Sequence, residues 1–518
     1  MSVCPAAARW AGVYRPAVSP PSAVCPADSA PLPTAADRGD MLPTEGLVQS
    51  AAAAEPAKGF IEYYVSNVKM DVTTMTYAAF MALSVACFVL LHLARHTKAQ
   101  LTAASNPHFV QFQRQFFAVY FLALFSDWLQ GPYVYKLYSH YGFAEYQIAV
   151  IYVVGFAASV VFGTATGPLA DRFGRKKTCI AFSVAYSLCC LTKLSRTYAV
   201  LLLGRVFGGI ATSMLFSTFE SWYVYEHVET HDFPAEWIAV TFSKATFWNG
   251  ILAIVAGVAS NMAAEWLGFG PVAPFLMAIP CLVACGGLVS AQWQENYGNQ
   301  QINLRRSYIN GLRTILASEV VALLGLIQSL FESVMYMFVF LWTPILDPSQ
   351  PPLGMVFSCF MVCIMMGSSL NTLLMGRGMR PERVLTLAVA INIVCMLVCT
   401  VATGPGAAMP GLAFAAFLFL ELAVGMYFPS MGYLRSQVIP EEQRASIMNW
   451  FRVPMNLITC GGLLWLHQGE SAGGNQVIFM ACAGLLMLAL VACLRFSRRY
   501  QETRLPEKDL TESKPSAL

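Results

Sequence analysis

Charged residues are scarce in this 518-residue sequence: only 12% are Asp, Glu, Lys or Arg, while 57% are hydrophobic. Soluble domains carry about 25% charged residues, so the scarcity excludes an ordinary soluble protein. The mean hydropathy of +0.55 and repeated apolar runs near the ~20 residues that a helix needs to cross a bilayer predict an all-α polytopic membrane protein in contact with lipid. The net charge of +3 gives no reason to expect nucleic acid as a partner.

Sequence motifs typical of soluble enzymes are absent as well. The sequence has no phosphate-binding loop, no Gly-x-Ser-x-Gly elbow and no complete dinucleotide fingerprint. We therefore expect neither an enzyme nor an ATP-driven pump, and no cofactor. Cysteine pairs at i, i+4 spacing have no His or carboxylate within a turn, and "HVETH" (227–231) lacks the Glu that a zinc hydrolase places directly after its first His. No metal site is expected either.

The apolar runs predict thirteen membrane spans, one more than an even-numbered bundle. They fall at 73–93, 112–135, 147–168, 178–194, 198–222, 238–263, 271–291, 318–343, 353–375, 384–403, 411–434, 445–467 and 476–496. The domains predicted from them are a disordered Pro/Ala-rich extension (1–69), an extra N-terminal transmembrane helix with its loop (70–111), an N-terminal six-helix half (112–291), a central loop (292–317), a C-terminal six-helix half (318–496) and a tail (497–518).

Lys and Arg are missing from four of the predicted loops, 264–270, 344–352, 404–410 and 468–475. Basic residues gather instead in the loops between them. Such clusters favour the cytoplasmic side of a membrane. We therefore predict that the central loop and the tail are cytoplasmic.

An internal repeat crosses the central loop. Matched residues are separated by 205, 212 and 208 positions, and the pairs are Asp127 with Glu332, Gly155 with Gly367, and Lys244 with Arg452. Two repeated halves with substrate handled between them are common in secondary transporters. Because the repeat starts at the second span, 73–93 is predicted to be an added helix outside the twelve.

The stretch "GPLADRFGRKK" (167–177) joins the third and fourth spans. Its pattern resembles the signature of the major facilitator superfamily, which implies two six-helix halves that alternate access. Its glycines are predicted to let helices turn and approach closely, and its Asp to pair with basic groups and lock a gate. "LLLGRVFGGIAT" (201–212) resembles the fourth-helix motif of the same superfamily, at Arg205 and Gly209. The gate motif residues are Gly167, Asp171, Arg172, Gly174, Arg175 and Lys176.

Longer strings resemble one family within that superfamily. They are "SDWLQGPYVYKLY" (126–138), "SLCCLTKLS" (187–195), "FESWYVYEHVETHDFPAEW" (219–237), "LFESVMYMFVFLWTPILDP" (330–348) and "NWFRVP" (449–454). Together they are similar to the molybdate-anion transporters, over roughly residues 70–500. The resemblance implies uptake of molybdate by a multi-pass protein of the cell membrane or an endomembrane.

Cations inside predicted spans mark candidate substrate contacts, because charge at this depth is costly. Lys244 lies ten residues beyond Pro234, and Arg452 lies twelve beyond Pro440. If both prolines open their helices, the cations are ~15 and ~18 Å deep, near the midplane. We expect both to bind an oxyanion. The polar residues that flank them, Thr241, Asn449 and Asn456, complete the predicted site.

Asp127 and Glu332 are also placed within spans, and two roles stay open for them. One role is to carry coupling protons, and the other is to pair with the two cations as buried salt bridges. Two alternatives to molybdate transport remain: another anion such as sulfate, or a receptor-like member that has lost transport.

Overall fold

The computed structural model describes residues 71–94, 106–234, 236–298, 304–404, 409–440, 443–466 and 474–512. Within these ranges the chain is helical and has no strand, in agreement with the all-α prediction. The predicted extension 1–69 and most of the loop that follows the first span lie outside the described residues.

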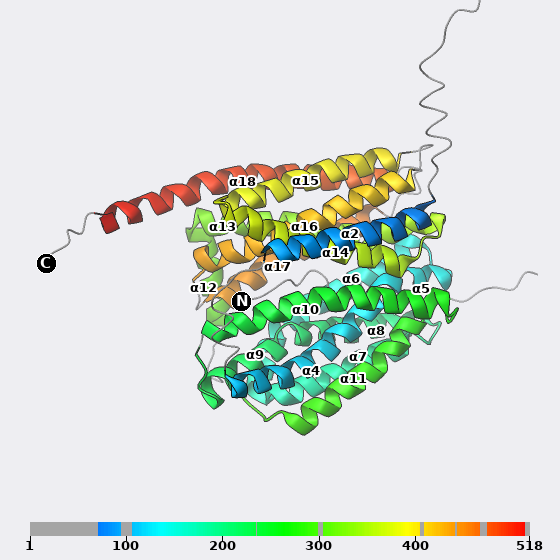
Figure 1. Cartoon of the computed structure of the whole chain (residues 1–518), viewed down its shortest axis with the longest axis horizontal. Helices are drawn as coiled ribbons and strands as arrows, with labels where there is room; N and C mark the ends of the chain where they lie inside the picture. Colours follow the sequence, from blue (N-terminus) through cyan, green and yellow to red (C-terminus); the bar gives the residue numbers. More distant parts are fainter. Residues whose placement is uncertain are drawn as a thin grey trace, which may run out of the picture. The chain divides into compact units, whose positions relative to one another are not determined.

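The first half runs from α4 to α11 (Figure 1). Asn106 caps α4: its side-chain oxygen accepts a hydrogen bond from the Phe109 N–H at 3.1 Å, and Pro107 takes the first helical position, where no N–H is needed. The elements are α4 (Pro107–Gln130), η1 (Gly131–Tyr133), α5 (Val134–His140), α6 (Glu145–Phe173), α7 (Arg175–Thr192), α8 (Tyr198–Leu215), α9 (Thr218–Tyr225), η2 (Glu226–Thr230), α10 (Glu236–Asn261), η3 (Met262–Trp266) and α11 (Ala273–Gln292).

The second half runs from α13 to α18 and is preceded by α12, which lies within the predicted central loop. Ser318 separates α12 from α13 and caps the latter by accepting a hydrogen bond from the Val321 N–H at 3.4 Å. The elements are α12 (Leu304–Ala317), α13 (Glu319–Leu346), η4 (Asp347–Ser349), α14 (Leu353–Gly376), α15 (Pro381–Ala402), α16 (Pro410–Val438), α17 (Arg444–Leu466) and α18 (Gly474–Glu512).

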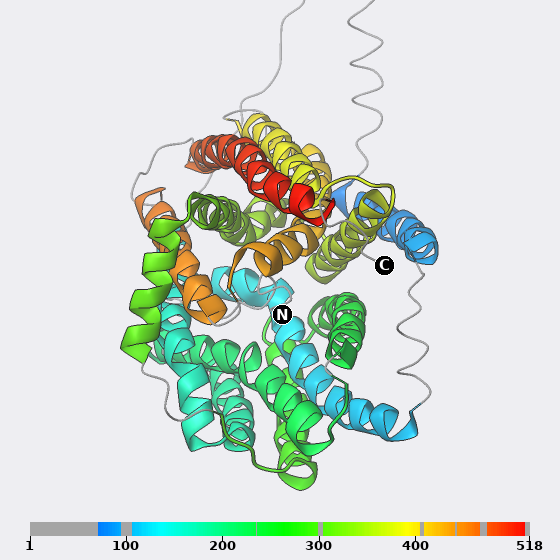
Figure 2. The ribbon, with the colours of Figure 1, turned by 90° about the vertical axis from the view of Figure 1, so that its left-hand side faces the viewer.

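Helix α2 (Val72–Ala94) stands outside these two sets, as predicted. It packs mainly on α14, and Figures 1 and 2 show it alongside the second half. Its remaining face is apolar and uncovered: Met81 and Phe88 are 66% and 71% exposed. Such a face suits lipid chains, which are as apolar as the side chains themselves.

A helix occupies each of the thirteen predicted spans. Among the described residues, ten helices are long and apolar enough to cross a membrane, judged by length and composition. The helices α4, α7 and α17 lie at the other three predicted spans. Some boundaries differ from the prediction: the span at 112–135 is interrupted by η1, the span at 198–222 breaks between α8 and α9, and α18 continues past 496 to Glu512.

Glycines mark the points where two helices touch through their backbones. A Cβ added at Gly367 on α14 would lie 2.0 Å from the carbonyl oxygen of Leu422 on α16, and Gly425 approaches α14 as closely. In the first half, a Cβ at Gly209 on α8 would lie 2.9 Å from the carbonyl oxygen of Gly155 on α6. The same crossing therefore occurs in both halves, in line with the internal repeat.

Two helix pairs make the most extensive contacts between the halves: α10 packs on α14, and α6 packs on α17. Figure 2 shows the two groups of helices, 107–292 in cyan and green and 319–512 in olive to red. In the first pair, a Cβ added at Gly354 would lie 2.3 Å from the carbonyl oxygen of Gly257. Nearby, the Ser358 hydroxyl donates to the carbonyl oxygen of Ile254 at 3.0 Å. The α10–α14 contact is thus a backbone contact between the halves.

Candidate functional site

The two predicted substrate cations occupy equivalent positions on equivalent helices. Helix α10 begins at Glu236 and α17 at Arg444, so Lys244 (244 − 236 = 8) and Arg452 (452 − 444 = 8) each lie eight residues from the first residue, or about 12 Å along the axis. The prediction that Pro234 and Pro440 open these helices was wrong, because both prolines precede them. The two cations therefore lie at the same distance from the starts of their helices, and this distance is shorter than expected.

Lys244 belongs to a chain of hydrogen bonds between α10, α4 and α9. Its ammonium donates to the Gln113 side-chain oxygen at 3.0 Å, and the Gln113 amide donates to the Thr241 hydroxyl at 2.6 Å. The Tyr223 hydroxyl lies 2.6 Å from the Thr241 hydroxyl and 3.1 Å from His227 Nδ1. Thr241 is thus a fully buried link in this chain, while Lys244 is only half-buried.

The surroundings of Arg452 involve α12. The Asn449 amide donates to the Tyr308 hydroxyl of α12 at 2.8 Å, and burial raises the pKa of that hydroxyl, which keeps it protonated. The Asn456 amide donates to the carbonyl oxygen of Arg452 at 2.7 Å. Both asparagines therefore have protein partners, and Asn449 ties the candidate site to the central segment.

The two acids have partners other than the predicted cations. Asp127 accepts a hydrogen bond from the Tyr186 hydroxyl of α7. Glu332 accepts bonds from Gln328 at 3.4 Å and Tyr427 at 3.3 Å. Arg435, buried on α16, is a further cation near Glu332, because its guanidinium donates at 3.3 Å to the side-chain oxygen of Gln328, the residue that donates to Glu332. The sequence did not reveal Arg435, because it lies just past the predicted end of its span at 434.

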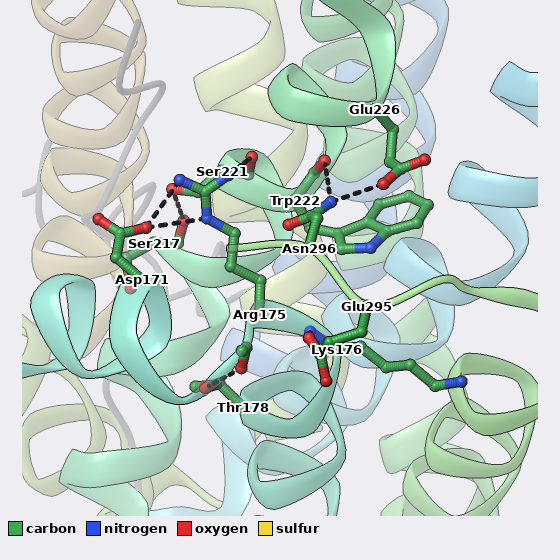
Figure 3. Close-up of polar contacts among 11 residues, drawn as sticks. Asp171, Arg175, Lys176, Thr178, Ser217, Ser221, Trp222, Glu226, Glu295 and Asn296 are labelled. Carbon is green, nitrogen blue, oxygen red and sulfur yellow. Dashed lines mark hydrogen bonds and ion pairs between the residues drawn. The ribbon is translucent and has the colours of Figure 1, made fainter. Parts of the chain in front are cut away.

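The gate motif sits where α6 meets α7, and this end of the bundle is called the motif end below (Figure 3). Asp171 accepts two hydrogen bonds from the Arg175 guanidinium, at 2.9 and 2.7 Å, and Arg175 also donates to the Ser221 carbonyl oxygen of α9 at 3.1 Å. Gly174 has φ +109°, a conformation that favours glycine. Gly167 has open space around it, so the expectation that it brings two helices together was wrong.

Residues that follow α11 form hydrogen bonds with the gate motif (Figure 3). The Glu295 carboxylate accepts from the backbone N–H of Lys176 at 2.8 Å and of Lys177 at 3.3 Å, at the start of α7, where a negative charge is favoured. Asn296 donates to the Glu226 carboxylate at 2.8 Å. Arg172 points elsewhere, over the Phe173 ring. Glu295 and Asn296 escaped the sequence reasoning because they lie about 120 residues from the motif.

The opposite end, where α5 and α13 terminate, is bridged by contacts between the halves. Lys136 of α5 forms an ion pair of 2.5 Å with Asp347, directly after α13. The Glu265 carboxylate accepts from the Tyr133 hydroxyl at 2.7 Å and from the Leu353 N–H of α14 at 3.3 Å. The Lys136–Asp347 pair, called the latch below, had no signal in the sequence.

The fourth-helix motif points inward. Arg205 is buried, and its Nε donates to the Ile151 carbonyl oxygen of α6 at 3.1 Å. Gly209 makes room for α6, as described above. No group of three or more metal-ligating side chains occurs within the described ranges.

The fold and these charged contacts define a polytopic secondary transporter of the major facilitator type. A family described as sugar transporters with twelve transmembrane helices matches residues 75–422. Solved structures share the fold at low identity: a nucleoside transporter, NupG (14% identical, TM-score 0.57, 74% of this chain and 99% of that one), and a peptide transporter, POT, in complex with sulfate (14%, TM-score 0.61, 75% and 94%).

Closer relatives define the family. Proteins named molybdate-anion transporter from Danio rerio (46% identical over 453 residues) and Xenopus tropicalis (48% over 428) each align with 81% of this chain and 94% of their own length. The chain belongs to the molybdate-anion transporter family of the major facilitator superfamily, which confirms the resemblance seen in the sequence. It is grouped with transporters and not with enzymes. These relatives match at 46% and 48% identity, against 14% for the two solved structures.

Proposed function

We propose that this protein takes up molybdate by alternating access between its two halves. The relatives named for molybdate transport support the substrate. The observation that carries the mechanism is the equal depth of Lys244 and Arg452 on equivalent helices. Molybdate is a tetrahedral dianion at neutral pH, and leaving water demands compensating positive charge.

The two cations have different tasks in this proposal. Arg452 offers a planar fork of donors to two oxygens of the anion, whereas Lys244 acts as a point charge. Thr241 holds Gln113 beside Lys244, and Gln113 gives up its bond to the ammonium when the anion arrives. Asn449 and Asn456 turn their amides to the remaining oxygens.

Protons are the proposed coupling ion, with Asp127 and Glu332 as the groups that carry them. Their buried positions and neutral hydrogen-bond partners support this role. The Asp171–Arg175 pair serves as the gate at the motif end, which faces the cytoplasm according to the distribution of basic residues. The site of action is the cell membrane, with an endomembrane as the alternative.

Uptake of radioactive molybdate into cells that lack the endogenous protein tests the proposal. Lys244→Ala and Arg452→Ala should each abolish uptake while the protein still reaches the membrane, and Arg452→Lys should retain little activity. Arg114→Ala, an exposed cation on α4, is the matched control and should transport normally. Normal uptake by both core variants would place the anion elsewhere, and preferential uptake of sulfate would change the substrate.

A further inference from the structure

Two cations that the proposed mechanism does not use are buried inside the first half. Lys193, directly after α7, is 0% exposed, and Arg205 on α8 is 4% exposed. The Lys193 ammonium lies 3.7 Å from the Cys189 sulfur and 6.0 Å from the centre of the Phe275 ring. The Arg205 guanidinium stacks 4.9 Å from the centre of the Tyr152 ring. Neither environment neutralises a positive charge.

The two charges are not balanced by acids. Lys193 and Arg205 are close enough to repel each other, and neither has a carboxylate within ion-pair distance among the residues that the structure describes. Asp127 shares the surroundings of Cys190 with Lys193 and offsets one charge at most, which leaves at least one positive charge (2 − 1 = 1). Uncompensated charge in a membrane interior is costly and tends to mark a functional site.

Two buried donor groups in this region lack a hydrogen-bond partner within the described part of the chain. Arg205 uses its Nε for the Ile151 carbonyl oxygen, but its Nη2 has no hydrogen-bond partner. The hydroxyl of Tyr138 on α5 is fully buried and also lacks a partner, and it lies within electrostatic reach of Arg205. An ammonium, a guanidinium N–H and a hydroxyl are donors suited to an oxyanion.

The position of this cluster gives it access to the opposite end. Lys193 lies 18 residues after Arg175 (193 − 175), about 27 Å from the motif end, and Arg205 lies seven residues after Tyr198 (205 − 198), about 10 Å from the other end of its helix. Helix α5 connects the cluster to the latch, because it carries both Tyr138 and Lys136. Movement of α5 on opening of the latch would therefore be the route by which an anion reaches the cluster.

We propose that Lys193, Arg205 and Tyr138 form a second oxyanion site, which binds a tetrahedral dianion near the opposite end before the anion reaches Lys244 and Arg452. The transported anion rests on the proposed function above, but binding at this site does not. The cluster takes a divalent oxyanion, molybdate or sulfate, since either supplies the missing negative charge and several acceptor oxygens.

Equilibrium binding of radioactive molybdate and sulfate to the purified full-length chain tests this site. In a Lys244→Ala/Arg452→Ala background, which removes the other site, binding should persist. Adding Lys193→Met or Arg205→Met should weaken it by about tenfold to a hundredfold, the effect of a lost charge-assisted hydrogen bond. Arg196→Met is the matched control: this cation is three residues from Lys193 but exposed, and its loss should leave affinity unchanged.

Folding and function are separated by two further measurements. Tyr138→Phe removes one hydroxyl only and should weaken binding by about twofold to tenfold, so the test survives if a methionine variant does not fold. Binding of sulfate that depends on Lys193, in a protein that takes up no molybdate, would support this site and overturn the proposed substrate. Absence of oxyanion binding in the double-alanine background, or binding unaffected by Lys193→Met, Arg205→Met and Tyr138→Phe, overturns the second site.

Discussion

Removing the latch should shift the protein toward a state open at the opposite end. The 2.5 Å pair joins α5 to the end of α13, and its side chains are 35% (Lys136) and 18% (Asp347) exposed. Water therefore screens part of the attraction, and about 1 kcal/mol is an appropriate value for the pair. A change of that size alters an equilibrium about fivefold. The Glu265 contacts with Tyr133 and Leu353 remain, so the end does not open completely.

A cysteine placed beneath the latch reports the open fraction. Phe340 is fully buried and packs edge-on against the rings of Tyr135 and Tyr152, at 5.5 and 5.1 Å. In a Phe340→Cys protein, Lys136→Ala should raise the labelling rate with a water-soluble maleimide about fivefold. The charge swap, Lys136→Asp with Asp347→Lys, should restore slow labelling. Equal rates in all three proteins would refute the idea that this pair holds the end closed.

Three further predictions concern packing, gating and topology. Gly367→Ala should lower the unfolding temperature in detergent, because a methyl group 2.0 Å from a backbone oxygen costs about 1–3 kcal/mol; Gly461→Ala, with no atom within 4 Å, is the control, and equal losses would contradict the argument. Asp171→Asn should slow uptake at equal surface expression, because Arg175 loses its charged partner; unchanged uptake would speak against a gate. Tags within 292–313 should be labelled only from the cytosol and an N-terminal tag only from the other side, and finding both tags in the cytosol would remove α2 as a span.

The positions of the helices followed from the sequence, because an apolar run long enough to cross a bilayer has few alternatives to a helix. The boundaries of these helices were harder to predict from the sequence. Pro234 and Pro440 have the chemistry of first-turn residues, yet α10 is described from Glu236 and α17 from Arg444. The break at η1 falls at Gly131 and Pro132, where the proline lacks a backbone donor, whereas neither Gly nor Pro marks the break between α8 and α9.

The candidate site was predictable where its residues are close in sequence. Asp171 and Arg175 are four residues apart and meet as expected. Contacts between distant segments, such as Glu295 with the start of α7, could not be read from local spacing. Lys193 was the hardest case, because a single lysine at the end of an apolar run looks the same whether it reaches water or is buried. Only the packing of α7 against its neighbours distinguishes the two.

The close backbone contact between Gly257 and Gly354 can serve as a pivot, called the bearing below, for rotation of one half against the other. The side chains of Ser358, Phe357 and Asn261 border this contact, but they lie so close to the pivot that a tilt of α10 against α14 displaces them only slightly. Gly257 lies 21 residues from the start of α10 (257 − 236), which makes the rest of that helix a lever arm of about 30 Å. A tilt of about 10° at the bearing then displaces the motif end by about 5 Å, roughly one helical turn. A small rotation at one end of the bundle is in this way enlarged into a passage at the other.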